Sequence, residues 1–182
     1  PRETISLNGT WKKMRTPGNH GLTLSARTVP NLALLKRENP EAVDPAFDDH
    51  AWQTCTIPGV ENPSPDRYMD VTWYRRTFKI PASFPGKRAI LTFGAANYAA
   101  DVWVNGEWIG SHEGGFTPFC FDVTSKLKAD KDNAIAVRVD NIPWLPQKAE
   151  SDKTQPPANQ SDIVPYKTAD WWNFGGLLRE VE

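Results

Sequence analysis

The residue types in this chain that suit catalysis are carboxylates. Glu113 and Asp170 each lie in a loop-like stretch beside glycines and aromatic residues. Glycoside hydrolysis uses two such groups, an acid and a second carboxylate, held on opposite sides of a sugar. Nothing in the sequence brings this pair together in space, and we interpret Glu113 and the adjacent His112 as structural. Asp170 has two interpretations, as a ligand for sugar hydroxyls or as the cap of the turn that follows it.

The sequence contains no motif for metal binding, nucleophilic catalysis or nucleotide binding. His20, His50 and His112 are scattered, no Cys-x-x-Cys pair occurs, and acidic pairs such as Asp48–Asp49 are typical of solvated turns. The chain also has no Gly-x-Ser-x-Gly elbow, no Gly-x-Gly-x-x-Gly loop and no phosphate-binding loop. We therefore predict no metal, no cofactor and no catalytic residue within this chain.

Composition places the chain among ordinary globular proteins. Its 182 residues suit one domain over 1–182, with 39% hydrophobic residues, 24% charged residues and a net charge of −1. No basic stripe predicts nucleic-acid binding, and no apolar run is long enough to span a bilayer. The sequence begins with Pro1 and not with Met, which is compatible with a removed leader. We slightly favour a periplasmic or secreted location. We expect Cys55 and Cys120 to be buried free thiols rather than a disulfide.

Tryptophan is unusually frequent, with eight in one small domain. An indole presents a flat apolar face and a polar edge, which suits the C–H faces and hydroxyl edges of a sugar. Large aromatic residues also fill the cores of β-sandwiches. For any single tryptophan the core interpretation is favoured.

Short alternating runs joined by turns predict an all-β fold. Along Val71–Ile80 the alternation puts Tyr74 and Phe78 on one face and Trp73 and Arg75 on the other. Asn105–Gly106 is the strongest hairpin signal, because both residues accept the positive φ of a type I′ turn. The expected strands cover residues 5–14, 51–57, 71–80, 88–93, 98–104, 107–111, 117–122, 134–140 and 177–181.

Helix is nearly absent from this pattern. Leu32–Lys36 is predicted as a short helix and Val123–Lys128 as one helical turn, while Asn141–Ala169 forms a long proline-rich loop of the kind that is functional or disordered. These elements predict a jelly-roll β-sandwich of about eight strands.

Six segments, taken in order, resemble a known family. They are residues 7–11 (LNGTW), 47–59 (FDDHAW to IPG), 73–78 (WYRRTF), 101–106 (DVWVNG), 110–119 (GSHEGGFTPF) and 170–179 (DWWNFGGLLR). Together they resemble the N-terminal sugar-binding domain of family-two glycoside hydrolases, which include β-galactosidases, β-glucuronidases and β-mannosidases. The resemblance covers nearly the whole chain except residues 18–44, which are longer than the family pattern.

The resemblance implies a galactose-binding-domain-like fold and a carbohydrate partner. In that family the domain precedes an immunoglobulin-like domain and a TIM barrel that carries two catalytic glutamates, so it implies that this chain is a non-catalytic part of a larger enzyme. The family's aspartate that reaches the substrate matches Asp170. With Trp171, Trp172 and Asn173, which follow it, Asp170 forms our predicted substrate-binding set.

Two other functions stay open. The chain could be a free-standing carbohydrate-binding module, for which an exposed coplanar pair of tryptophans is expected. It could also be a structural domain used for packing or dimerisation, for which a large apolar face without a cleft is expected.

Overall fold

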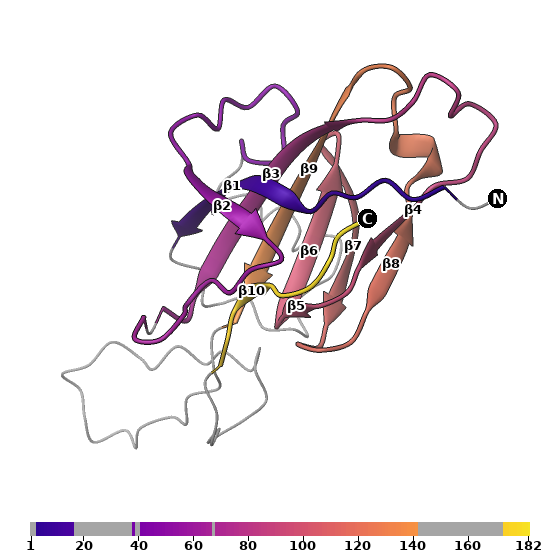
Figure 1. Ribbon diagram of the computed structural model, residues 1–182. Coiled ribbons are helices and arrows are strands. Elements are labelled where there is room, and N and C mark those ends of the chain that lie inside the picture. The colour runs from indigo at the N-terminus through magenta and orange to yellow at the C-terminus, as the bar shows by residue number, and fades with distance from the viewer. Residues whose placement is uncertain (1–2, 17–37, 39–40, 67, 142–172) are drawn as a thin grey trace.

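Figure 1 shows the computed structural model, which describes residues 3–16, 38, 41–66, 68–141 and 173–182. This part of the chain is built from short β-strands with one 3-10 turn, Thr124–Lys126, inside the predicted helical turn. The predicted helix at residues 32–36 lies outside the described residues. The strands are β1 Gly9–Thr16, β2 Gln53–Ile57, β3 Val71–Lys79, β4 Ile90–Phe93, β5 Ala96–Asn97, β6 Ala99–Val104, β7 Glu107–Glu113, β8 Phe119–Asp122, β9 Asp132–Asp140 and β10 Gly176–Leu177.

Two antiparallel layers make up the sandwich. The larger sheet has the order β2-β1-β3-β9-β6-β7. The second layer contains the pairs β10-β5 and β4-β8, and a bridge between Phe93 and Val181 connects β4 to the C-terminal residues. The predicted all-β sandwich is thus confirmed, and among the described strands only the two-residue β5 has no counterpart in the expected strand ranges.

The main core lies between the two layers and follows the strand alternation. Tyr74 on β3, Val102 on β6 and Val137 on β9 point into it from the large sheet, and Phe93 and Phe119 stack from the second layer with ring centroids 4.8 Å apart. Burying such alternating apolar residues is the dominant favourable contribution to folding.

The opposite face of the large sheet is buried too. Trp73 and Trp103, whose ring centroids are 5.3 Å apart, pack beneath Ala42, Val43 and Trp52. The first half of β3 is therefore buried on both faces, whereas Thr77 and Lys79 beyond it are exposed. Periodicity alone could not show that the segment 41–52 covers this face.

Two arginines are buried on this second face. Arg75 donates to Asp49 at 3.1 Å and to the carbonyl of Ala42. Arg138 donates to Glu38 at 2.6 and 2.8 Å and to Asp140 at 3.0 Å. Burial lowers the pKa of Arg138, but the surrounding carboxylates outweigh burial and raise that pKa above its usual value. Each buried cation is thus paired, as burial of charge requires.

The predicted hairpin at Asn105–Gly106 is confirmed. The φ angles of these residues are 51° and 85°, both in the left-handed region that a type I′ turn needs. The side chain of Asn105 also donates to Lys126 O at 2.7 Å and accepts from Ala134 N at 2.9 Å. The turn therefore joins β6 and β7 and contacts β9 as well.

The cysteines are free, as predicted, but their burial is not as predicted. Cys55 is half-buried and Cys120 is exposed, because Cys120 points outward from β8. Partial burial raises the pKa of the Cys55 thiol to about 11. In the described part of the chain no helix is long and apolar enough to cross a membrane.

Candidate functional site

Asn173 is the described member of the predicted binding set, and it lies in a group of four asparagines. Its Nδ2 donates to the carbonyl of Asn141 at 2.8 Å, and its Oδ1 accepts from Asn97 Nδ2 at 2.8 Å. Its carbonyl accepts from Asn62 Nδ2 at 2.9 Å and from Asn141 Nδ2 at 3.4 Å. We call Asn62, Asn97, Asn141 and Asn173 the asparagine cluster.

The asparagine cluster fixes the path of the chain into β10. Gly175 N donates to Asn62 Oδ1 at 2.8 Å, and its carbonyl accepts from Glu61 N at 2.8 Å. A side chain at Gly175 would collide with Asn141, and one at Gly176, whose φ is 109°, would lie 2.8 Å from the hydroxyl of Tyr74. The Gly-Gly pair therefore exists because the backbone passes close to two polar side chains.

A buried carboxylate supports the same loop. Glu61 accepts from Lys13 at 2.9 Å, from Arg15 at 2.7 Å and from the hydroxyl of Tyr74 at 3.0 Å. Burial and the neighbouring carboxylate raise the pKa of Tyr74 well above its usual value, so its hydroxyl stays a donor. Because both oxygens of Glu61 accept hydrogen bonds, this residue anchors the loop that carries Asn62.

The rest of the predicted binding set, Asp170, Trp171 and Trp172, lies outside the described residues. Asn173 is half-buried. Its carboxamide has two donor hydrogens and an oxygen with two lone pairs, of which the asparagine cluster uses one each. Among the described residues, one donor and one lone pair of this carboxamide therefore take part in no hydrogen bond.

His112 is packed against Phe119, whereas Glu113 lies at the surface. Glu113 is exposed at the end of β7. The ring of His112 stacks on Phe119 at 4.3 Å, its Nε2 lies 3.1 Å from Thr117 Oγ1, and burial lowers its pKa. This packing accounts for His112 without a ligand.

The sequence did not point to three members of the asparagine cluster. Asn62, Asn97 and Asn141 are separated from Asn173 by 111, 76 and 32 residues, so no local spacing connects them. The only available signal was positional, because Asn141 and Asn173 flank the long proline-rich segment. Among the described residues, no three His, Cys, Asp or Glu side chains are grouped as metal ligands would be.

Most of the tryptophans that the structure describes belong to the core. Trp11, Trp52, Trp73 and Trp103 are at most 7% exposed, whereas Trp108 is 36% exposed. The core interpretation is therefore correct for these four. The described residues contain no exposed pair of tryptophans.

The two antiparallel layers define an all-β, jelly-roll type of sandwich domain. Residues 5–182 match the model of the glycosyl hydrolases family 2 sugar-binding domain. The chain therefore belongs to glycosyl hydrolase family 2, as its N-terminal sugar-binding domain. This confirms the resemblance seen in the sequence.

Individual relatives support the same family assignment. The chain is 31% identical to a β-glucuronidase of Paenibacillus borealis over 187 residues, which cover 100% of this chain and 29% of the relative. It is 32% identical to a β-galactosidase of Thermoanaerobacter pseudethanolicus, and that match covers 74% of this chain and 17% of the relative. A solved β-glucuronidase 2 of Bacteroides uniformis, covalently bound to cyclophellitol-6-carboxylate aziridine, superposes with a TM-score of 0.70 at 27% identity, covering 98% of this chain and 17% of that one. The chain thus spans less than a third of the length of these relatives.

Proposed function

We propose that this domain forms part of the wall of the substrate pocket in a β-glycosidase, and that its role there is binding. The main observation in favour of this proposal is the match of residues 5–182 to a sugar-binding domain. In this proposal the catalytic carboxylates lie on a barrel in a longer protein, next to an immunoglobulin-like domain. The short span of this chain relative to its relatives supports that arrangement.

Asp170 is the proposed sugar ligand. A carboxylate accepts hydrogen bonds from sugar hydroxyls, and such charge-assisted bonds are about twice as strong as neutral ones. Trp171 and Trp172 offer apolar faces to the ring, and Asn173 offers the unused donor and lone pair of its carboxamide. Holding the sugar in this way positions the bond that reacts elsewhere.

The asparagine cluster supports this assignment through position. Asn173 stands three residues after Asp170 in the sequence and is held by Asn62, Asn97 and Asn141. A ligand-binding residue close to such an anchored position costs less entropy to order than one in a free loop.

The relatives are named β-glucuronidases and β-galactosidases, so we propose that the sugar is a β-glucuronide or a β-galactoside. The test is Asp170→Asn in the longer protein, with both chromogenic substrates. We expect kcat/KM to fall roughly ten- to a thousand-fold, the loss of one or two charge-assisted bonds of about 1.5–3 kcal/mol each. The melting temperature should change little.

Glu113→Gln is the matched control, because Glu113 is an exposed carboxylate near a Gly-Gly pair. It should leave both kinetics and stability unchanged. The loss caused by Asp170→Asn should shrink for a deoxy substrate that lacks the bonded hydroxyl. Wild-type kinetics for Asp170→Asn would remove Asp170 from the pocket and favour a purely structural domain.

A further inference from the structure

Phe116 is the most exposed large apolar side chain that the structure describes, with 64% of its surface accessible. It lies in the loop between β7 and β8, and Figure 1 shows this loop at the same end of the sandwich as the start of β10. A single exposed apolar residue is common on protein surfaces, so exposure alone indicates no function. Phe116 differs from such residues because the loop on both sides of it is fixed.

Contacts on each side of Phe116 hold the loop. Before it, Gly114 N donates to the carbonyl of Tyr98 at 3.1 Å. After it, Thr117 Oγ1 lies 3.1 Å from Nε2 of His112, whose ring is packed in the fold. A ring that is already held in place loses little conformational freedom when a ligand covers it, so less of the binding free energy is spent on ordering.

The residue before Phe116 packs directly on the asparagine cluster. A Cβ at Gly115 would collide with the side-chain oxygen of Asn97, so glycine allows the loop to lie against this carboxamide. The nitrogen of the same carboxamide donates to Asn173 Oδ1 at 2.8 Å and also to the carbonyl of Phe174. The side chain of Asn97 therefore lies between the loop that carries Phe116 and the predicted binding residue Asn173.

Aromatic rings and amide groups thus occur together at this end of the sandwich. Phe174, which follows Asn173, is 40% exposed, and Phe116 belongs to the loop on the other side of Asn97. An aromatic ring can cover the C–H face of a sugar, while placed polar groups bond its hydroxyls. This combination fits a carbohydrate derivative better than a purely apolar ligand.

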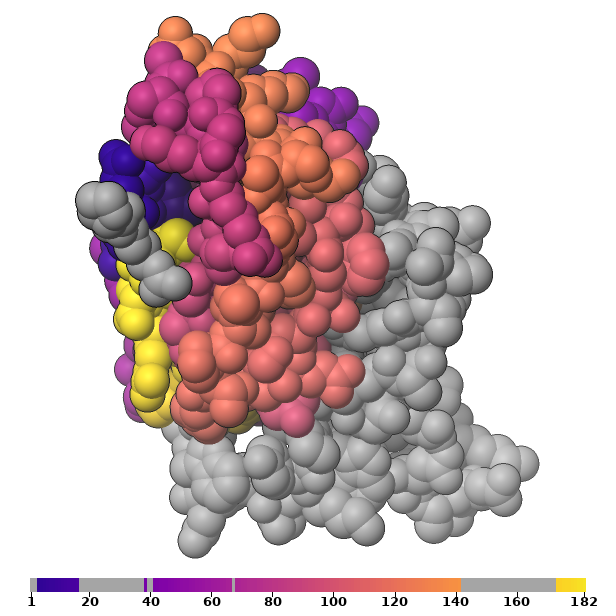
Figure 2. All heavy atoms as spheres, turned by 90° about the vertical axis from the view of Figure 1, so that its right-hand side faces the viewer, coloured from indigo at the N-terminus to yellow at the C-terminus, as the bar shows by residue number. Residues whose placement is uncertain are grey.

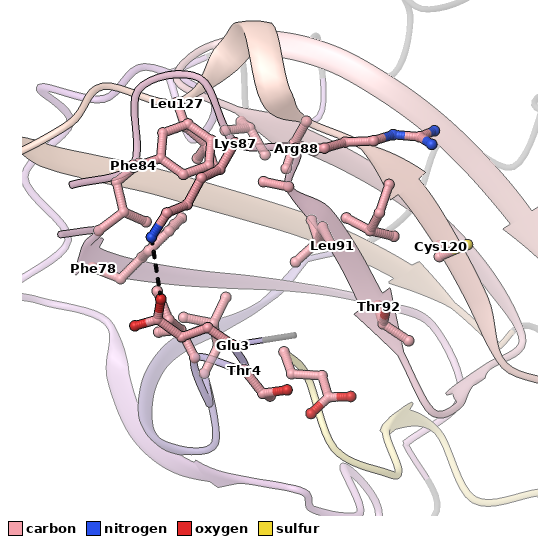
Figure 3. Close-up of a pocket in the computed structure, with 18 of the residues that line it drawn as sticks. Glu3, Thr4, Phe78, Phe84, Lys87, Arg88, Leu91, Thr92, Cys120 and Leu127 are labelled. Atoms are coloured by element: carbon pink, nitrogen blue, oxygen red, sulfur yellow. Dashed lines mark hydrogen bonds and ion pairs between the residues drawn. The ribbon is translucent and has the colours of Figure 1, made fainter. Parts of the chain in front are cut away.

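A cavity of about 720 Å³ lacks this combination. It lies between residues 3–7, the loop before β4, and β4 itself (Figure 3). Figure 2 shows this side of the molecule, where the indigo N-terminal residues, the yellow C-terminal residues and the magenta loop meet at the surface. Of its charged side chains, Lys87 pairs with Glu3 at 3.5 Å and Arg88 pairs with Asp122 at 2.8 Å. No asparagine or glutamine of the described residues lines it, so amide groups like those of the asparagine cluster are missing there.

We propose that Phe116 contacts the leaving group of the glycoside, which is the group joined to the sugar through the bond that is broken. Asp170 and Asn173 are proposed to hold the sugar itself. Because Asn97 separates Asn173 from Gly115, Phe116 lies beside that sugar and faces the group attached to it. The leaving group that fits has a flat face, as an aryl ring or a second pyranose ring has. This inference rests on the proposed function, since it requires a sugar bound at Asp170.

The test compares wild type with Phe116→Ala in the longer protein on three β-glycosides of the same sugar, an aryl glycoside, a disaccharide and a methyl glycoside. For each substrate, kcat/KM of the variant is divided by that of wild type, so the intrinsic reactivity of the leaving group cancels. We expect a fall of roughly three- to tenfold for the aryl glycoside and less than about twofold for the methyl glycoside, which has no flat group. A similar fall for the disaccharide identifies a sugar ring as the preferred leaving group, and a fall for the aryl glycoside alone identifies an aromatic one.

Three further variants separate the ring from other effects. Phe116→Tyr keeps the flat ring and should keep wild-type kcat/KM on every substrate. Phe116→Leu keeps apolar volume without a flat face, so it should show the same selective loss, and it replaces Phe116→Ala if that variant does not fold. Trp108→Ala removes an exposed aromatic ring from β7 outside the asparagine cluster and should affect none of the three substrates.

An equal fall for the methyl glycoside would overturn the assignment of Phe116 to the leaving group, because the residue would then act on the sugar or on the fold. Wild-type kcat/KM for Phe116→Ala on both the aryl glycoside and the disaccharide would overturn it as well. Asp170→Asn, assayed in parallel, should lower kcat/KM for all three glycosides. A loss with Asp170→Asn but none with Phe116→Ala would remove only Phe116 from the pocket, whereas wild-type kinetics for Asp170→Asn would count against the pocket itself.

Discussion

At the scale of single residues, Asn173 has a structural role in addition to the binding role predicted for it. Its carboxamide donates to Asn141 and accepts from Asn97, so it cannot be exchanged for a carboxylate without losing a donor. The motif around residues 170–176 suggested a sugar ligand here, and the structure adds a structural duty to that interpretation. Binding by Asn173 stays a prediction.

Asn173→Asp should destabilise this domain. The new carboxylate would face the carbonyl of Asn141, and a lost bond of this kind, with the remaining acceptor left unpaired, costs about 1–3 kcal/mol. The midpoint of urea unfolding measures this cost. Asn8→Asp is the control, because Asn8 Oδ1 only accepts, from Val181 N, and aspartate keeps that acceptor. Equal midpoints for wild type and Asn173→Asp would show that the asparagine cluster does not anchor β10.

At the scale of elements, the sequence predicted the strands and turns that depend on residues close together in the chain. The alternation along β3 and the Asn105–Gly106 turn were predicted correctly because side-chain period and turn chemistry act over a few residues. The first strand begins at Gly9 rather than Ile5, because Leu7 bonds with Val181 at the far end of the chain. The asparagine cluster and the cover of residues 41–52 over Trp73 are contacts distant in sequence, which no local pattern encodes.

The hairpin between β6 and β7 allows a direct test of its turn. Asn105→Val should lower the melting temperature, because a β-branched residue resists a φ of 51° and because the bonds to Lys126 and Ala134 are lost. Asn105→Gly separates the two causes, since glycine keeps the turn but not the bonds. A thermal melt should therefore rank wild type above Asn105→Gly and Asn105→Gly above Asn105→Val. Any reversal of the two variants would contradict a conformational role for the turn.

The join between β8 and the 3-10 turn predicts a pH effect. Asp122 accepts from Thr124 Oγ1 at 2.6 Å, from Thr124 N at 3.0 Å and from Arg88 at 2.8 Å, which together lower its pKa from 3.8 to about 2. Because the folded pKa is depressed, the stabilisation is present above pH 3.8 and is lost as pH falls through about 2. Asp122 is exposed, so salt should weaken the part due to Arg88.

The comparison of wild type with Asp122→Asn isolates this contribution. The difference in melting temperature should be present at pH 7 and should shrink below pH 3.8. Asp132→Asn is the control, because Asp132 pairs only with Lys79 at 3.7 Å and both side chains are mostly exposed. A difference for Asp122→Asn that stays constant from pH 7 to pH 2 would mean that its ionisation is not what stabilises the turn.

At the scale of the whole molecule, we propose that sugar binding and bond cleavage belong to different domains. In the described part of the chain Glu61 is engaged by two cations, Asp140 is buried against Arg138 and Glu113 is exposed. Glycoside hydrolysis needs two carboxylates facing each other across a sugar, roughly 5 to 9.5 Å apart. Of these three, Glu61 and Asp140 are already held in ion pairs within the fold.

The isolated chain should therefore not turn over chromogenic β-galactosides, β-glucuronides or β-mannosides, since the acid and the second carboxylate of the reaction are proposed to lie on another domain. Steady release of the chromophore over hours, measured against a no-protein blank, is the assay. Contaminating glycosidase is controlled by purifying Glu113→Gln and Asp170→Asn in parallel, because a contaminant would act alike in all three samples. Turnover by wild type that disappears in either variant would instead place a complete catalytic pair within these 182 residues.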